Sequence, residues 1–361
     1  MKNKKVLIIA VVAVVVVLAV VLGVVLGGNK TPDPNPTPAT EKEYKFGLGV
    51  EFAEFTAGEI GATVAAVVLD DAGKIVACRI DTIQNQFSVD EEVNYSRINT
   101  KRELKYDYKM SAFGTSLIGN ATVKEWFEQA EAYEAWVVVK TATQIKNMKT
   151  QVAGEYGYVI ANEKDLLDAG CTISIEEFRD AVVKACNDAQ GTTFKTNGTF
   201  TVGLAINSED NGSTVSDEGY TVKMNCDIAA TVMAGGKVLA SLNDAMQPQV
   251  TVDADGAVTE QSVGKGAGVL KTKRELKEDY KMAAFGTSLV GNAKATEWYI
   301  QSAAFSAHIK GMTKAQVSAM PTQTISNGYT ISNDKALLDA GCTMSIDGII
   351  SVVVKSIDNA R

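Results

Sequence analysis

One stretch of sequence occurs twice in this chain, and it constrains the fold more than any other feature. Residues 100–126 read TKRELKYDYKMSAFGTSLIGNATVKEW, and residues 272–298 read TKRELKEDYKMAAFGTSLVGNAKATEW. Of the 27 aligned positions 21 are identical, at a constant offset of 172 residues. Such self-similarity indicates an internal duplication. We therefore expect two units of one fold, a first repeat at residues 43–190 and a second repeat at residues 191–361.

The residues before the repeats predict a membrane anchor. Three lysines among the first five residues precede an apolar run at residues 6–26, which would be about 31 Å long as a helix at ~1.5 Å per residue. That length crosses a bilayer, and it exceeds the apolar core of a cleaved signal peptide. We expect a cytoplasmic stub at residues 1–5, a transmembrane signal anchor at 6–27 and both repeats outside the cytoplasm, at the plasma membrane. The alternative is a buried helix of a soluble domain.

The segment at residues 28–42 is predicted to be an extended spacer. It contains four of the six prolines of the chain, at Pro32, Pro34, Pro36 and Pro38. Alternating proline favours the polyproline II conformation and cannot pack as a helix or a central strand. The spacer would hold the repeats away from the membrane, which suits display on a bacterial cell surface.

Composition excludes several classes of function. The net charge is −8 and no run of basic residues occurs, so nucleic acid is not an expected partner. The single histidine, His308, cannot supply a catalytic dyad or a metal site in both repeats. The five cysteines are odd in number and form no CxxC pair, which argues against a disulfide framework or a zinc site. No metal is expected, and no catalytic residues stand out.

Within each repeat the pattern places strands before helices. A strand is expected at 46–55, followed by a hairpin of 63–69 and 74–80 around an Asp-Asp-Ala-Gly turn. The second repeat has the matching hairpin, 226–233 and 237–242, preceded by a polar stretch at 207–218 that we expect to be an exposed loop.

Helices follow the strands in both repeats. Trp126, Ala130, Tyr133 and Val137 define one apolar helix face, and Trp298, Ser302, Phe305 and Ile309 define its counterpart. Short helices are expected at 143–148 and 313–320. The closing helices are expected to begin at a Ser174-x-x-Glu177 capping box and, over 346–357, at Ser345. The order predicts an α+β fold: two tandem homologous domains, each an antiparallel sheet or hairpin with two or three helices packed on one face.

A second motif is repeated just before each closing helix. Residues 166–175 and 337–346 share the pattern Leu-Leu-Asp-Ala-Gly-Cys-Thr-x-Ser-Ile. This segment resembles the closing segment of the bacterial FMN-binding domain family, whose members carry a Ser-Gly-Ala-Thr motif before a helix. The Gly-Lys hairpins at 72–75 and 235–238 resemble that family as well. The sequence departs from the family pattern at Ala169 and Ala340, where the family has serine.

The resemblance implies a flavin site in each repeat. In the family the threonine of the motif carries FMN through a phosphoester bond, and the matching residues here are Thr172 and Thr343. The other residues that the resemblance places at the cofactor are Gly170, Ser174, Gly341 and Ser345. The glycine turn before a helix could present free N–H groups to a phosphate, but the same residues also form ordinary helix starts. Cys171 and Cys342 hold equivalent positions. They either form a paired thiol function or are small buried residues.

The repeated block itself is a second candidate site. It preserves cations and a carboxylate beside an aromatic ring, a combination that suits an anionic or carbohydrate ligand or, equally, a solvated face. The candidate ligand-binding residues are Lys101, Arg102, Asp107 and Tyr108, with their counterparts Lys273, Arg274, Asp279 and Tyr280.

Two functions follow from these observations. The first is a membrane-anchored, extracytoplasmic tandem-repeat binding or structural protein of the bacterial cell envelope, without a cofactor, whose ligand is an envelope component or a small molecule. The second is an FMN-carrying electron-transfer protein of the cell envelope.

Overall fold

The computed structural model describes residues 40–361, except 114–116, 119–121, 265–267, 286–294 and 327. Residues Glu41–Arg361 form one compact unit that contains both repeats. The predicted anchor at 6–27 and most of the spacer lie outside the described residues. In the part of the chain that the structure describes, no helix is both long and apolar enough to cross a membrane.

The strands form two main antiparallel sheets. The first sheet has the order β4-β3-β2-β1-β7. Its members are β1 (Lys42–Phe52), β2 (Glu59–Leu69), β3 (Ile75–Val89), β4 (Val93–Arg97) and β7 (Thr193–Thr196). The predicted first hairpin is confirmed, because Leu69 of β2 pairs with Ile75 of β3 across the turn.

The second sheet is built around one long strand, β10 (Gly219–Ala234). One half of β10 pairs with β8 (Thr201–Asp210) and β11 (Lys237–Met246). The other half pairs with β9 (Thr214–Ser216) and β12 (Pro248–Asp253), which in turn pairs with β13 (Val258–Val263). The prediction of an exposed loop at 207–218 was therefore wrong for residues 207–210 and 214–216, which form strands, whereas 211–213 and 217–218 lie outside strands. Polar residues continue β8 and form β9 there, because β10 offers them a partner strand.

The two sheets pack against each other through a shared apolar core. Side chains alternate along β2, so Val64, Ala66 and Val68 enter this central core, together with Ile206, Ile228 and other residues of the second sheet. The intervening residues of β2, such as Val67, face the helices of the first repeat. Every residue of β2 after Glu59 is buried, since the strand is covered on both faces.

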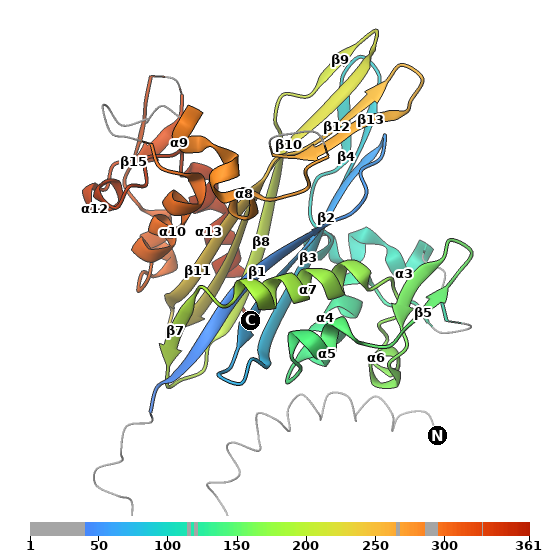
Figure 1. The fold of residues 1–361 in the computed structure, drawn as a ribbon, viewed down its shortest axis with the longest axis horizontal. Coiled ribbons are helices and arrows are strands. Elements are labelled where there is room, and N and C mark those ends of the chain that lie inside the picture. The colour runs from blue at the N-terminus through green and yellow to red at the C-terminus, as the bar shows by residue number, and fades with distance from the viewer. Residues whose placement is uncertain (1–39, 114–116, 119–121, 265–267, 286–294, 327) are drawn as a thin grey trace, which may run out of the picture. The chain divides into compact units, whose positions relative to one another are not determined.

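Helices cover the outer face of each sheet, on opposite sides of the molecule (Figure 1). The first repeat has α2 (Lys101–Leu104), η1 (Lys105–Tyr108), α3 (Met110–Phe113), α4 (Trp126–Val137), α5 (Ala142–Lys146), α6 (Lys164–Asp168) and α7 (Glu176–Asp188). The second has α8 (Lys273–Leu276), η2 (Lys277–Tyr280), α9 (Met282–Phe285), α10 (Trp298–His308), α11 (Lys314–Ser318), α12 (Lys335–Asp339) and α13 (Asp347–Asp358). Small hairpins precede the closing helices: β5 (Thr150–Ala153) with β6 (Tyr158–Ala161), and β14 (Thr322–Thr324) with β15 (Thr330–Ser332).

These elements confirm the α+β class with antiparallel sheets, and they include short helices that were not predicted. The two apolar helix faces are confirmed, since Trp126, Tyr133, Trp298 and Phe305 are buried. The predicted capping box at Ser174 and the predicted Ser345 cap were wrong. Neither α7 nor α13 has a side-chain cap, because Glu177 bonds to a strand and Ser345 donates to the Thr330 carbonyl and to Asp347.

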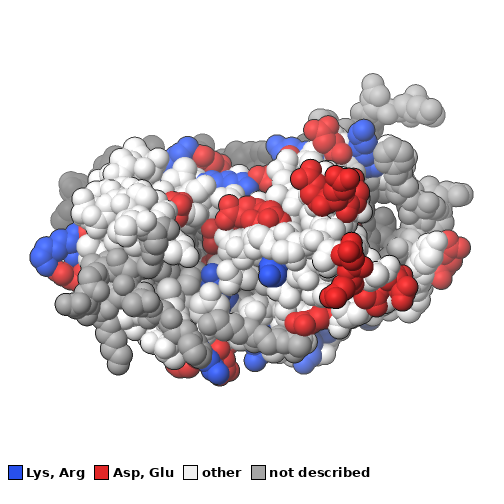
Figure 2. Space-filling view, turned by 90° about the horizontal axis from the view of Figure 1, so that it is seen from above, with Lys and Arg blue, Asp and Glu red and all other residues white. Residues whose placement is uncertain are grey.

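Acidic side chains gather on part of one face of the molecule. Figure 2 shows Asp and Glu concentrated in the right half of the face seen from above, with fewer Lys and Arg between them. On this face the charge is unfavourable for a polyanion such as nucleic acid.

Candidate ligand-binding site

A cavity of about 660 Å³ lies in the first repeat between the β5–β6 hairpin, the start of α4 and the start of α7. Its lining brings together three residues that the sequence had placed in separate candidate sites: Lys101 of the repeated block, and Thr172 and Ser174 of the second motif. The remaining lining residues are Thr63, Thr82, Met110, Leu117, Val123, Trp126, Gly154, Glu155, Tyr156, Tyr158, Ile173, Glu177 and Phe178. A volume of this order suits one small molecule.

One wall of the cavity is aromatic. Trp126 and Phe178 meet edge to face with their ring centroids 5.5 Å apart, and they belong to the helix core beneath. Tyr156 and Tyr158 stand at the opening with ring centroids 6.1 Å apart. They remain 77% and 45% exposed. Two large rings left in solvent beside a cavity are typical of a binding surface.

Another part of the cavity lining is a chain of hydrogen bonds. Thr63 of β2 lies 2.8 Å from Thr82 of β3, hydroxyl to hydroxyl, and the Thr63 hydroxyl donates to Glu177 of α7 at 2.7 Å. Both threonines are buried. The Glu177 carboxylate is therefore held in place, and it has accepting capacity left for a donor on a ligand.

Lys101 supplies the positive charge of the cavity, and aromatic rings position it. Its Nζ lies 5.2 Å from the ring centroid of Tyr108 and 5.8 Å from that of Trp126. Tyr108 is itself fixed by a 2.8 Å hydrogen bond from its hydroxyl to the Gln84 side chain. A cation held over two rings keeps its donors directed toward the cavity at a small cost in side-chain entropy.

The loop that carries Thr172 is held by a buried glutamine. Gln129 of α4 accepts from the Thr172 amide at 2.8 Å, and its own amide donates to the Lys124 carbonyl at 2.8 Å. Just before it, Gly170 adopts φ +91° and ends α6. The Gly170 and Cys171 amides donate back to Leu167 and Leu166, a Schellman termination. The amides that the sequence offered to a phosphate are thus engaged within the protein.

The second repeat reproduces this framework. The Lys273 Nζ lies 5.3 Å from the Tyr280 ring centroid and 5.5 Å from that of Trp298. Gln301 accepts from the Thr343 amide at 2.8 Å. Gly341 also has φ +91°. Ser345 follows at the start of α13, as Ser174 does before α7.

The second repeat also has a carboxylate near its lysine, but that carboxylate belongs to a strand, whereas Glu177 belongs to a helix. Asp227 of β10 has the same position in its hairpin as Thr63 of β2, and Gly348 of α13 aligns with Glu177 of α7. The Asp227 Oδ2 atom lies where a side chain on Gly348 would begin, 2.2 Å from an ideal Cβ position. Burial raises the pKa of Asp227, and the positive charge of Lys273 counteracts that rise. Both repeats therefore place a carboxylate near the lysine, one from the helix and one from the strand.

Four predicted ligand residues lie elsewhere. Arg102 and Arg274 point to the junction between the repeats, where they form ion pairs with Glu134 and Asp188. Asp107 and Asp279 are exposed on η1 and η2 and line neither of the two cavities described here.

The cysteines and possible metal ligands can be placed as well. All five cysteines are buried and free, and burial raises the pKa of the Cys171 and Cys342 thiols to about 12. Thiols of this kind are poor nucleophiles at neutral pH. Among the described residues, no group of three or more His, Cys, Asp or Glu side chains could hold a metal ion.

Sequence reasoning missed Gln129, Glu177 and Tyr156 as functional side chains. Gln129 and Gln301 occupy equivalent places on an otherwise apolar helix face, and this recurrence was an available signal. No comparable signal marked Tyr156, because the sequence of the second repeat has no tyrosine at the matching position.

Comparisons with known proteins place the chain only loosely. No family model matches it, and no solved structure matches it. A protein named chlorophenol reductase from Desulfitobacterium hafniense is 26% identical over 197 residues. That alignment covers 41% of this chain and 58% of the relative, so the chain spans less than two thirds of the relative's length.

Proposed function

We propose that the protein is an extracytoplasmic binding protein of a bacterial cell envelope, anchored by residues 6–27, whose first repeat holds a small planar ligand. The observation that carries the proposal is the cavity in which Lys101, Glu177 and the exposed rings of Tyr156 and Tyr158 converge. A flat apolar body would stack on the tyrosines. Its polar end would accept from Lys101 and donate to Glu177.

A fluorescent aromatic anion, 8-anilinonaphthalene-1-sulfonate, tests the cavity directly. We expect saturable binding to the full chain in detergent, with energy transfer from Trp126. Lys101→Ala and Tyr156→Ala should each weaken binding by about five- to tenfold, equivalent to about 1 kcal/mol or slightly more. Lys273→Ala is the matched control and should bind as the wild type does. Equal losses for Lys101→Ala and Lys273→Ala would refute a site specific to the first repeat.

A second candidate function is flavin binding, and one observation favours it. Thr172, the residue that the resemblance assigns to FMN, lines the same cavity as four aromatic side chains and Lys101. Covalent attachment would require the Thr172 hydroxyl to leave Gln129, which lies 3.4 Å from it. Neither proposal rests on the partial similarity to the chlorophenol reductase.

Mass spectrometry of protein from its own host separates the two candidates. The tryptic peptides at residues 165–179 and 336–355 contain Thr172 and Thr343. An FMN adduct on either threonine, abolished by Thr172→Ala or Thr343→Ala, would establish a covalent flavoprotein. Unmodified peptides from colourless protein would leave the binding protein without covalent flavin. Fractionation of the same cells tests the anchor, since truncation before residue 41 should release the repeats from the membrane.

A further inference from the structure

The two repeats meet through two equivalent junctions. In one, Lys184 of α7 donates to the Val50 carbonyl of its own repeat and lies 3.9 Å from Glu275 of the other. In the second junction, Lys355 of α13 donates to the Ile206 carbonyl and lies 2.5 Å from Glu103 of the first repeat. Glu103 and Glu275 are the same residue of the repeated block, so the contacts are reciprocal, as in an interface with a two-fold axis.

The junction that contains Glu103 and Lys355 is filled by charged side chains around Glu134 of the first repeat. Glu134 of α4 accepts from Arg102 at 2.7 Å and from Arg361, the last residue of the chain, at 2.8 Å. Arg79 lies 3.8 Å from the same carboxylate. The side chain of Glu134 is only 6% exposed. The Glu134 carboxylate is therefore paired with the guanidinium groups of three arginines.

The equivalent junction, which contains Glu275 and Lys184, is open. Ser306 stands where the first repeat has Glu134, and Leu242 and Gln190 stand in the places of Arg79 and Arg361. A cavity of about 570 Å³ remains. Arg274, the counterpart of Arg102, turns to Asp188 instead, and its Nη2 atom lies 3.0 and 3.2 Å from the two carboxylate oxygens.

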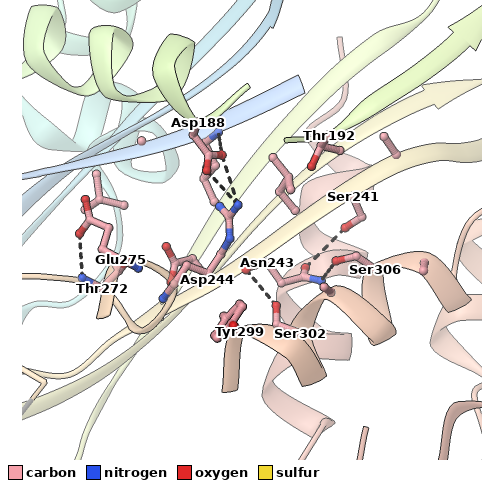
Figure 3. Close-up of a pocket in the computed structure, with 18 of the residues that line it drawn as sticks. Asp188, Thr192, Ser241, Asn243, Asp244, Thr272, Glu275, Tyr299, Ser302 and Ser306 are labelled. Carbon is pink, nitrogen blue, oxygen red and sulfur yellow. Dashed lines mark hydrogen bonds and ion pairs between the residues drawn. The ribbon is translucent and has the colours of Figure 1, made fainter. Parts of the chain in front are cut away.

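Hydroxyl and amide groups replace apolar ones at the floor of this open junction. Ser241, Asn243 and Ser302 stand in the places of Cys78, Ile80 and Ala130. Asn243 donates to Ser306 at 2.8 Å, and Ser302 donates to the Asn243 carbonyl at 3.0 Å (Figure 3). All three are buried, so the polar groups serve the cavity and not bulk solvent.

The charges at the cavity favour an anion. Four cationic side chains line it, against three carboxylates that are already engaged: Asp188 by Arg274, Glu275 by the Thr272 amide and Asp244 by the Arg274 amide. Neither Lys277 nor Lys310 forms an ion pair with a described residue, and both are exposed side chains at the cavity. Their ammonium groups are the donors left for a ligand.

We propose that the open junction is a second binding site, for a small anionic carbohydrate such as a sugar acid or a sugar phosphate. The serine and asparagine groups would exchange hydrogen bonds with the sugar hydroxyls, and Lys277 and Lys310 would meet the anion. The site is separate from the aromatic cavity of the first repeat and does not depend on the function proposed for it.

Calorimetric titration of the full chain in detergent tests the proposal with D-glucuronate, glucose 6-phosphate and neutral D-glucose as probes. We expect one-to-one binding of at least one of the two anions, and binding of glucose at least about tenfold weaker. The anion that binds more tightly identifies whether a carboxylate or a phosphate is preferred. Absence of heat for both anions at about 10 mM, or equal binding of glucose, would overturn the proposal.

Two variants locate the site. Ser306→Glu installs the carboxylate that fills the first junction and should reduce anion affinity by about tenfold or more. Lys310→Ala changes an exposed residue, keeps the fold and should reduce it by about three- to tenfold. Lys101→Ala is the control and should bind the sugar as the wild type does. Wild-type affinity in both junction variants would show that the sugar binds elsewhere.

Discussion

At the scale of single residues, one buried amide is a defect that a substitution can remove. Asn85 of β3 is fully buried, and neither its amide nitrogen nor its oxygen has a hydrogen-bond partner among the described residues. We expect Asn85→Val to raise the free energy of unfolding by about 1–2 kcal/mol, because an unsatisfied polar group leaves the interior. Urea unfolding measures the change. A loss of stability would show that the amide has a partner, such as a buried water molecule.

A second buried amide should behave in the opposite way. Gln129 satisfies the Thr172 amide and the Lys124 carbonyl, and both lose their partner if it is removed. Gln129→Leu should therefore lower the free energy of unfolding by about 2–4 kcal/mol. Gln301→Leu is the matched variant in the second repeat and should cost a similar amount. Unfolding of both variants under the same conditions as Asn85→Val completes the comparison.

Asp244 should make stability depend on pH. Burial raises the pKa of Asp244 from 3.8 to about 6, although Arg274 acts in the opposite direction. A carboxyl whose pKa is higher in the folded state favours folding when protonated, so this contribution falls as pH rises from about 4 to about 6. Asp244→Asn should flatten that decline by about 2–3 kcal/mol. Urea unfolding at several pH values measures the pH dependence of the free energy of unfolding. Asp255→Asn changes an exposed carboxylate and serves as the control. A pH profile of Asp244→Asn that matches the wild type would contradict a raised pKa of Asp244.

At the scale of elements, the closing helix α7 rests directly on strand β1. An ideal Cβ at Gly47 would lie 2.0 Å from the Ala185 carbonyl oxygen, so only glycine permits this approach. Gly47→Ala should cost about 3 kcal/mol or more, or prevent folding, since the obstacle is backbone. Gly191→Ala, whose Cβ would lie 3.8 Å from the nearest atom, should change stability by no more than about 0.5 kcal/mol. Thermal unfolding or soluble yield separates the two variants.

The sequence predicted those elements whose stability is local. The hairpins around Gly73 and Gly236 and the apolar faces of α4 and α10 follow from turn chemistry and periodicity. The start of α7 was mispredicted because Glu177 bonds to Thr63, which lies 114 residues away. The strand residues 207–210 and 214–216 were missed for a similar reason, since pairing with β10 keeps these polar residues extended. The cavity is formed by residues of several elements. The spacing of Lys101 and Thr172 along the sequence could not predict that they line the same cavity.

At the scale of the whole molecule, the two repeats should unfold together. Their sheets share one apolar core, and β7 of the second repeat pairs with β1 of the first. The three tryptophans allow a direct test, because Trp126 and Trp136 report on the first repeat and Trp298 on the second. We expect Trp298→Phe and the double variant Trp126→Phe, Trp136→Phe each to show a single fluorescence transition that coincides with its own loss of helical circular dichroism.

Different transition midpoints by fluorescence and by circular dichroism in either variant would contradict this expectation. They would show that the repeats unfold one after the other and that the central core does not couple them. Ile228→Ala, in that core, should lower the midpoint for both sets of tryptophans by the same amount when coupling holds.

The reciprocal lysine–glutamate contacts have a consequence for the history of the protein. Identical copies of a single repeat, paired about a two-fold axis, would have carried the same residue at both junctions, and any substitution would have altered both at once. Joining two copies in one gene removes that restriction. One junction could then hold Glu134 and Arg361 while the other holds Ser306 and Gln190 at the equivalent positions. Two equivalent junctions of one chain can therefore carry different residues, which identical subunits paired about a two-fold axis cannot do.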